Sequence, residues 1–66
     1  MKTKIAELRK EHGISQDELA KAMFVSRQTI NSIEKEKYVA SLPLAYKISK
    51  YFNMSIEEVF DLEEED

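Results

Sequence analysis

The sequence predicts an all-α domain of five short helices, and three observations lead to that prediction. Glycine and proline occur once each in 66 residues, so few positions interrupt a helix. Apolar residues recur at helical spacing in several short runs. Each of the last four runs follows a serine, whose hydroxyl can accept a hydrogen bond from the free N–H groups of a first helical turn. These serines are Ser15, Ser26, Ser41 and Ser55.

The first two helices are indicated by their ends. Ile5 and Leu8 share one face of the first helix, which should end at Gly13, because glycine readily adopts the left-handed conformation that follows many helices. Ser15 and Glu18 have the spacing of a capping box and should open the second helix. The buried stripe of that helix is expected to contain Leu19, Ala20 and Met23.

Three further helices are expected in the rest of the chain. The third should run over 27–35 and be followed by a loop over 36–40. Pro43 suits the first turn of the fourth helix, where its missing N–H has no helical partner, and Asn53 should end that helix. Ser55 begins a second capping box and a last short helix. With no cysteine to form a disulfide, the chain must rely on a small apolar core, which a second copy could complete.

Charge is distributed unevenly along the chain. The net charge is −3, which is unusual for a protein that binds nucleic acid. However, residues 21–50 contain six basic and two acidic residues, whereas residues 54–66 contain seven acidic residues and no basic one. Phosphates respond to the local field, which salt screens beyond about 8–10 Å. The basic middle could therefore contact DNA, and a merely solvated surface is the alternative.

One face of the third helix carries the residues that suit base recognition. At about 100° per residue, Thr29, Ile30 and Ile33 cluster on the arc that should face the core. The opposite arc contains neither an acid nor an aliphatic residue. Arginine can donate two hydrogen bonds to guanine, and asparagine or glutamine can pair with adenine. A polar face that is only solvated is the alternative to base reading by this arc, which comprises Arg27, Gln28, Asn31, Ser32 and Lys35.

The second and third helices also have the spacing of a DNA-binding unit. Two short helices separated by about three residues can cross steeply, so that the second enters a groove while the first lies over the backbone. Gln16 lies in the first turn of one helix and Ser26 caps the other. Free N–H groups and the positive end of the helix dipole can hold a phosphate at both positions. Capping alone would also explain the serine.

The two segments of this unit resemble the Cro/cI (Xre-type) helix-turn-helix family. The residues that carry the resemblance are Ile14-Ser15-Gln16-Asp17-Glu18-Leu19-Ala20 and Val25-Ser26-Arg27-Gln28-Thr29-Ile30. The segment after the third helix and the stretch from Ser41 to Phe60 are similar to the family's loop and two closing helices. The resemblance implies a phage-repressor-like DNA-binding domain over 1–60, with its helix-turn-helix unit at about 15–35 and an acidic tail over 61–66.

The resemblance also implies roles for individual residues. Arg27, Gln28 and Ser32 would face base edges, with Asn31 as a neighbouring candidate. Arg9 and Glu34 match a pair that bridges the first and third helices, and we assign that pair to structure. Contacts to phosphate would come from Gln16, Lys35, Lys37 and Tyr38. Members of the family usually bind a two-fold operator in double-stranded DNA as homodimers, and we expect a repressor, with activation as the alternative.

Two positions depart from the family pattern. Glycine is common in the family's turn where this chain has Phe24, so the turn must find another conformation or accept strain. Glycine or asparagine is common in the loop where this chain has Glu36, and an acid beside phosphates should weaken binding. We therefore expect modest affinity, or a dimer whose geometry moves Glu36 away from DNA.

Apolar residues in the C-terminal half favour a dimer. Five short helices cannot readily cover all of the large side chains there, and some should remain exposed for a partner. In addition, Met1–Lys4 and Asp61–Glu63 could pair as two short strands that place Leu62 against a second copy. The residues expected to form this apolar surface are Leu42, Tyr46, Tyr51, Phe60 and Leu62.

Other functions have weaker support. A protein-interaction module, such as an antitoxin or accessory regulator, could act through the acidic tail, although a tail that only aids solubility is simpler. An enzyme is not expected, because the single histidine, His12, lies beside a helix-ending glycine and no glycine-rich phosphate loop is present. We expect a cytoplasmic protein without catalytic residues, metal, cofactor, small-molecule effector, signal peptide or membrane span.

Overall fold

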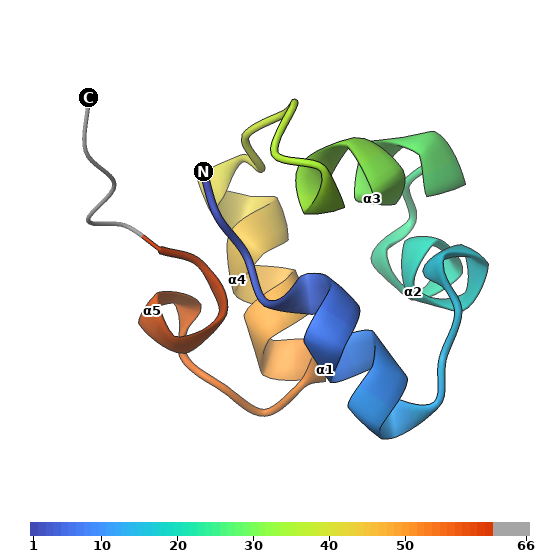
Figure 1. The fold of residues 1–66 in the computed structure, drawn as a ribbon, viewed down its shortest axis with the longest axis horizontal. Helices are drawn as coiled ribbons and strands as arrows, with labels where there is room; N and C mark the ends of the chain where they lie inside the picture. The colour runs from blue at the N-terminus through green and yellow to red at the C-terminus, as the bar shows by residue number, and fades with distance from the viewer. Residues whose placement is uncertain (62–66) are drawn as a thin grey trace.

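The computed structural model describes residues 1–61 and contains five helices, as the sequence predicted (Figure 1). Within that part of the chain no residue forms a β-strand. None of its helices is long and apolar enough to span a bilayer. Leu62 and the rest of the acidic tail lie outside the described residues. The helices are α1 (Ile5–His12), α2 (Gln16–Met23), α3 (Arg27–Glu34), α4 (Leu42–Tyr51) and α5 (Ile56–Val59).

The four serines cap helices α2 to α5, as predicted. The side chains of Ser15 and Ser55 each accept a hydrogen bond from a backbone N–H three residues later, and the glutamate at that later position bonds back to the serine N–H. Ser26 and Ser41 accept the same kind of bond without the returning glutamate. Each serine caps a short helix, for which a cap contributes about 1 kcal/mol.

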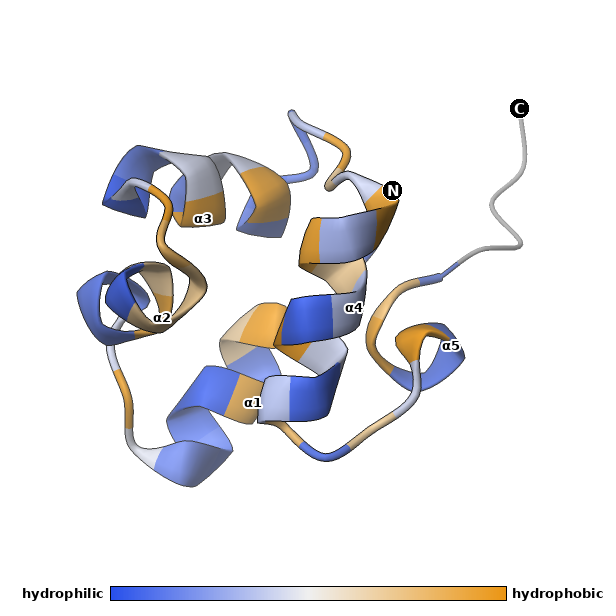
Figure 2. Cartoon of the chain, turned by 180° about the vertical axis from the view of Figure 1, so that it is seen from behind, coloured by the Kyte–Doolittle hydropathy of each residue, from blue (hydrophilic) through white to orange (hydrophobic). Residues whose placement is uncertain are grey.

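Helices α2 and α3 pack together at one end of the molecule, while α4 and α5 pack together at the other (Figure 1). The hydrophobic sides of the helices face one another, and the outward sides of α2 and α3 are largely hydrophilic (Figure 2). All five helices and the residue after α5 contribute to one apolar core. Its fully buried apolar residues include Ile5, Leu19, Ile30, Ile33, Ile48, Val59 and Phe60.

The two ends of the described chain meet in one antiparallel bridge between Thr3 and Phe60. The Lys4 N–H donates to the carbonyl of Val59 at 2.8 Å, and the Asp61 N–H donates to that of Lys2 at 2.9 Å. Of the expected strand pair of Met1–Lys4 with Asp61–Glu63, the described residues contain only this bridge, which starts one residue earlier at Phe60, while Leu62 and Glu63 lie outside them. Pairing begins at the end of α5, because this position inserts the Phe60 ring into the core.

The burial of Phe60 corrects a second expectation. Its side chain was expected to contribute to an exposed apolar surface, but it is only 1% exposed. Leu42, Tyr46 and Tyr51 are exposed, as expected, and Tyr51 contacts the ring of Phe52 edge-on. The bridge seats Phe60 by tying the N-terminal segment to the end of α5. Part of the apolar surface expected to need a partner is thus covered within the chain itself.

Both departures from the family pattern take up left-handed backbone. Phe24 has φ 61° and Glu36 has φ 62°, so neither position escapes the conformation that glycine adopts most easily. Phe24 ends α2, and its N–H donates to carbonyls of the last turn. Phe24 is 88% exposed, and the Lys47 ammonium lies 5.8 Å from the centroid of its ring. The turn therefore keeps its shape at the cost of strain.

We predict that Phe24→Gly is more stable than Phe24→Ala by about 0.5–1 kcal/mol. Both variants remove the exposed ring, but only glycine relieves the left-handed strain, and part of that gain is lost to the larger entropy of the unfolded glycine chain. Urea unfolding followed by circular dichroism measures the difference. Equal unfolding free energies for the two variants would show that this turn is not strained.

Candidate nucleic-acid interface

The outward arc of α3 presents the residues that were assigned to base reading. Arg27 and Gln28 are exposed, whereas Asn31 and Ser32 are half-buried at the edge of the helix. On the opposite side, Ile30 and Ile33 are buried in the core, as predicted. Thr29 was expected to face the core with them, but it is only half-buried. Its hydroxyl lies 2.9 Å from that of Ser26, so Thr29 takes part in the N-terminal cap of α3 instead.

An ion pair attaches the C-terminal end of α3 to α1. The Arg9 guanidinium donates to both Glu34 carboxylate oxygens, with Nε to Oε2 at 2.6 Å and Nη2 to Oε1 at 3.1 Å. The two side chains are 14% and 8% exposed, and a third Arg9 bond goes to the carbonyl of Ile14. Hydrogen bonding to Glu34 raises the pKa of Arg9. The one acid of α3 is therefore neutralised on the inner side of the helix.

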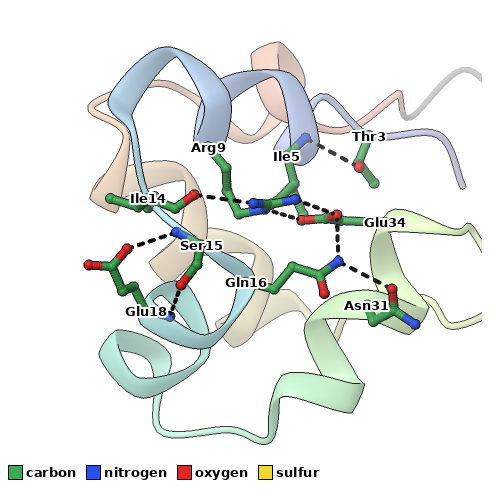
Figure 3. Close-up of polar contacts among 9 residues, drawn as sticks. All are labelled: Thr3, Ile5, Arg9, Ile14, Ser15, Gln16, Glu18, Asn31 and Glu34. Atoms are coloured by element: carbon green, nitrogen blue, oxygen red, sulfur yellow. Dashed lines mark hydrogen bonds and ion pairs between the residues drawn. The ribbon is translucent and has the colours of Figure 1, made fainter.

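Gln16 joins this ion pair to the outward face of α3. Its amide nitrogen, Nε2, donates to Glu34 Oε1 at 2.9 Å and to Asn31 Oδ1 at 3.2 Å (Figure 3). Sequence reasoning did not find this link. The i, i+3 spacing of Asn31 and Glu34 places them side by side on α3, but the approach of Gln16 depends on how α2 packs against α3.

The remaining candidates border the same face. Gln16, Arg27, Gln28 and Asn31 line a shallow hollow of about 320 Å³. Tyr38, from the loop after α3, lines a second hollow of about 270 Å³ together with Ser26, Gln28, Thr29 and Ser32. The structure thus brings the start of α2, the outward side of α3 and the following loop together. Lys35 and Lys37 are exposed in that loop but line neither hollow.

Glu36 and His12 are the two residues that could complicate this interface. Glu36 is exposed between the two loop lysines, and its left-handed backbone turns the chain at that point. His12 lies at the end of α1, where its ring packs on Phe52 with centroids 5.1 Å apart. Across residues 1–61, no group of three histidine, cysteine or acidic side chains has the arrangement of a metal site.

Comparisons with known proteins agree with this geometry. A helix-turn-helix family model matches residues 5–59. The chain is 54% identical over 65 residues to an uncharacterized HTH-type transcriptional regulator, YgzD, of Bacillus subtilis, and the alignment covers 98% of each chain. It is 48% identical over 66 residues to an uncharacterized HTH-type transcriptional regulator of Methanocaldococcus jannaschii, with 100% of both chains covered.

A solved structure shows the same fold. The clp gene regulator ClgR from Corynebacterium glutamicum matches with a TM-score of 0.75 at 22% sequence identity. The match covers 82% of this chain but 57% of that one, so the present chain spans little more than half of the ClgR structure. The sequence resemblance, the five-helix fold and the family match agree. The chain therefore belongs to the Cro/cI-type helix-turn-helix family of transcriptional regulators.

Proposed function

We propose that this regulator is a sequence-specific repressor that binds double-stranded DNA in the cytoplasm with α3 in the major groove. The observation that carries the proposal is the arrangement of charge on α3. The single acid of the helix, Glu34, is bound by Arg9 on the inner side, so the outward side carries no acid. A major groove is about 12 Å wide and admits one helix with its side chains, which fits a short and polar outward face.

Four residues of α3 are proposed to read bases. Arg27 and Gln28 are exposed in the first turn of α3 and can reach furthest into a groove. We assign Arg27 to guanine O6 and N7 and Gln28 to adenine N6 and N7. Asn31 and Ser32 lie one turn later on the same face and are assigned to the next bases.

The flanking residues are proposed to hold the DNA backbone. The side-chain amide nitrogen of Gln16 already donates two bonds within the protein, so we assign its phosphate contact to the backbone N–H at the start of α2. Ser26 offers the corresponding position at the start of α3. In the loop after α3, Lys35, Lys37 and Tyr38 would contact the phosphates that flank the bases read by α3.

A homodimer on a two-fold operator is the assembly that we propose. Support comes from an apolar groove of about 580 Å³ between α4 and the start of α5, whose exposed rim includes Val39, Leu42 and Tyr46. Lys50 and Glu57 also line it, so two copies related by a two-fold axis could pair these opposite charges. Val39 directly follows the proposed phosphate-binding loop. A partner on this groove would therefore bring two α3 helices to one side of the assembly.

Gln28→Ala is predicted to weaken binding to the preferred sequence by about 1–3 kcal/mol, because it removes a bidentate base contact.

Lys37→Ala should weaken binding to all sequences alike, because it removes a phosphate contact, and should reduce the slope of log K against log salt by about one unit. Fluorescence anisotropy with a duplex selected from a random library, and with a scrambled duplex, measures both effects. An equal loss on both duplexes for the Gln28 variant would remove it from the base-reading residues.

Leu42→Glu is predicted to shift the chain from dimer toward monomer, because it places an acid at an exposed apolar position, 72% accessible in the single chain. Losing a buried leucine contact of about 1.5–3 kcal/mol in each copy should raise the dimer dissociation constant by well over tenfold. Sedimentation velocity at tens of micromolar measures the change. Tyr51→Ser is the matched control, since Tyr51 is exposed but does not line the groove. A wild-type chain that sediments as a monomer at these concentrations would refute the proposed dimer.

A further inference from the structure

We propose that Asn31 reads its base through the amide nitrogen alone and selects a base that presents a hydrogen-bond acceptor, and that Gln16 imposes this polarity. In the major groove guanine, adenine and thymine each present an acceptor, whereas cytosine presents only an amine. The inference rests on the proposed DNA-binding function and adds a rule for one base position. Asn31 is the specificity-determining residue, and Gln16 is a positioning residue.

The first step is the contact between Gln16 and Glu34. Glu34 forms two hydrogen bonds to the Arg9 guanidinium, and an ionised carboxylate can only accept hydrogen bonds. The Gln16 amide atom that lies 2.9 Å from Glu34 Oε1 must therefore be the nitrogen. The amide oxygen in that place would meet another oxygen without a proton between them. The ion pair thus fixes which way the Gln16 amide is turned.

The second step passes this orientation to α3. An amide nitrogen carries two hydrogens, and the second one of Gln16 faces an Asn31 atom at 3.2 Å. That atom must be an acceptor, so it is the Asn31 carbonyl oxygen. The Asn31 nitrogen then points away from Gln16 (Figure 3) and has no hydrogen-bond partner among residues 1–61. Asn31 borders the hollow that Arg27 and Gln28 also line.

The consequence is a fixed donor where an amide would otherwise offer a donor and an acceptor. An unrestrained asparagine pairs with adenine by donating to N7 and accepting from N6. Asn31 has its oxygen turned back toward α2, so it cannot present both atoms side by side. Its nitrogen can donate to guanine O6 or N7, to adenine N7 or to thymine O4. Cytosine presents only its N4 amine, which would put donor against donor, and a mismatch of this kind costs about tenfold or more in affinity.

Selection of binding sites from a random duplex library by the purified full chain tests the inference. Asn31→Ala first identifies the base position that Asn31 reads, because the base preference at that position should vanish while the preferences at the other positions remain. At that position the wild type should discriminate by about tenfold between the two orientations of the G·C pair, against the one that places cytosine at the Asn31 nitrogen. Asn31→Asp keeps an acceptor for Gln16 but turns an acceptor outward. It should reverse the preferred orientation of the G·C pair, so that cytosine is favoured where the wild type disfavours it, whatever its overall loss of affinity from phosphate repulsion.

Gln16→Met separates positioning from reading. It keeps the length of the side chain and the backbone N–H of α2 but removes the amide, so Asn31 can turn over and the preference at its position should flatten. The inference is overturned if Asn31→Ala changes no position, if the wild type does not discriminate between the two orientations of G·C there, or if Asn31→Asp keeps the wild-type preference. A wild type that selects no sequence at all overturns the proposed function instead. Circular dichroism of every variant confirms that it is folded.

Discussion

The ion pair between Arg9 and Glu34 is the interaction on which the rest of the site depends. It spans 25 positions of sequence and joins α1 to the end of α3 by two hydrogen bonds, with both side chains largely covered. A buried ion pair adds little net stability, because desolvation offsets much of the attraction, but losing one partner is costly. Its value here is geometric. It holds the acid of α3 inward and gives the Gln16 amide a fixed orientation.

The small size of the domain explains why so much depends on polar contacts at helix ends. Each helix has ten residues or fewer, and helices of that length are marginal in water without packing and caps. The serine caps, the bridge at Thr3 and Phe60 and the ion pair all connect or end such helices. The strained Phe24 turn is tolerated in the same framework. It keeps α2 and α3 at the angle that exposes one side of α3.

Most of the fold could be predicted from the sequence, because its signals are local. Serine caps, capping boxes and the left-handed Gly13 require only neighbouring residues, and the apolar spacing identified the core side of α3 at Ile30 and Ile33. Apart from Thr29, which joins the nearby cap of Ser26, the errors arose where distant segments meet. Burial of Phe60 depends on its bridge to the N-terminal segment, and the Gln16 bonds to Asn31 and Glu34 depend on the packing of α2 against α3. Neither the burial of Phe60 nor the Gln16 bonds can be predicted from the spacing of neighbouring residues in the sequence.

The most direct test of the account is an NMR titration of the ¹⁵N-labelled chain with a duplex selected from a random library. Chemical-shift changes should concentrate on the outward residues of α3, the first turn of α2 and the loop over 35–38. The Asn31 side-chain amide should shift most among the side chains of asparagine. Changes centred on α1 or on the acidic end of the chain, with α3 unaffected, would contradict the claim that this helix reads DNA.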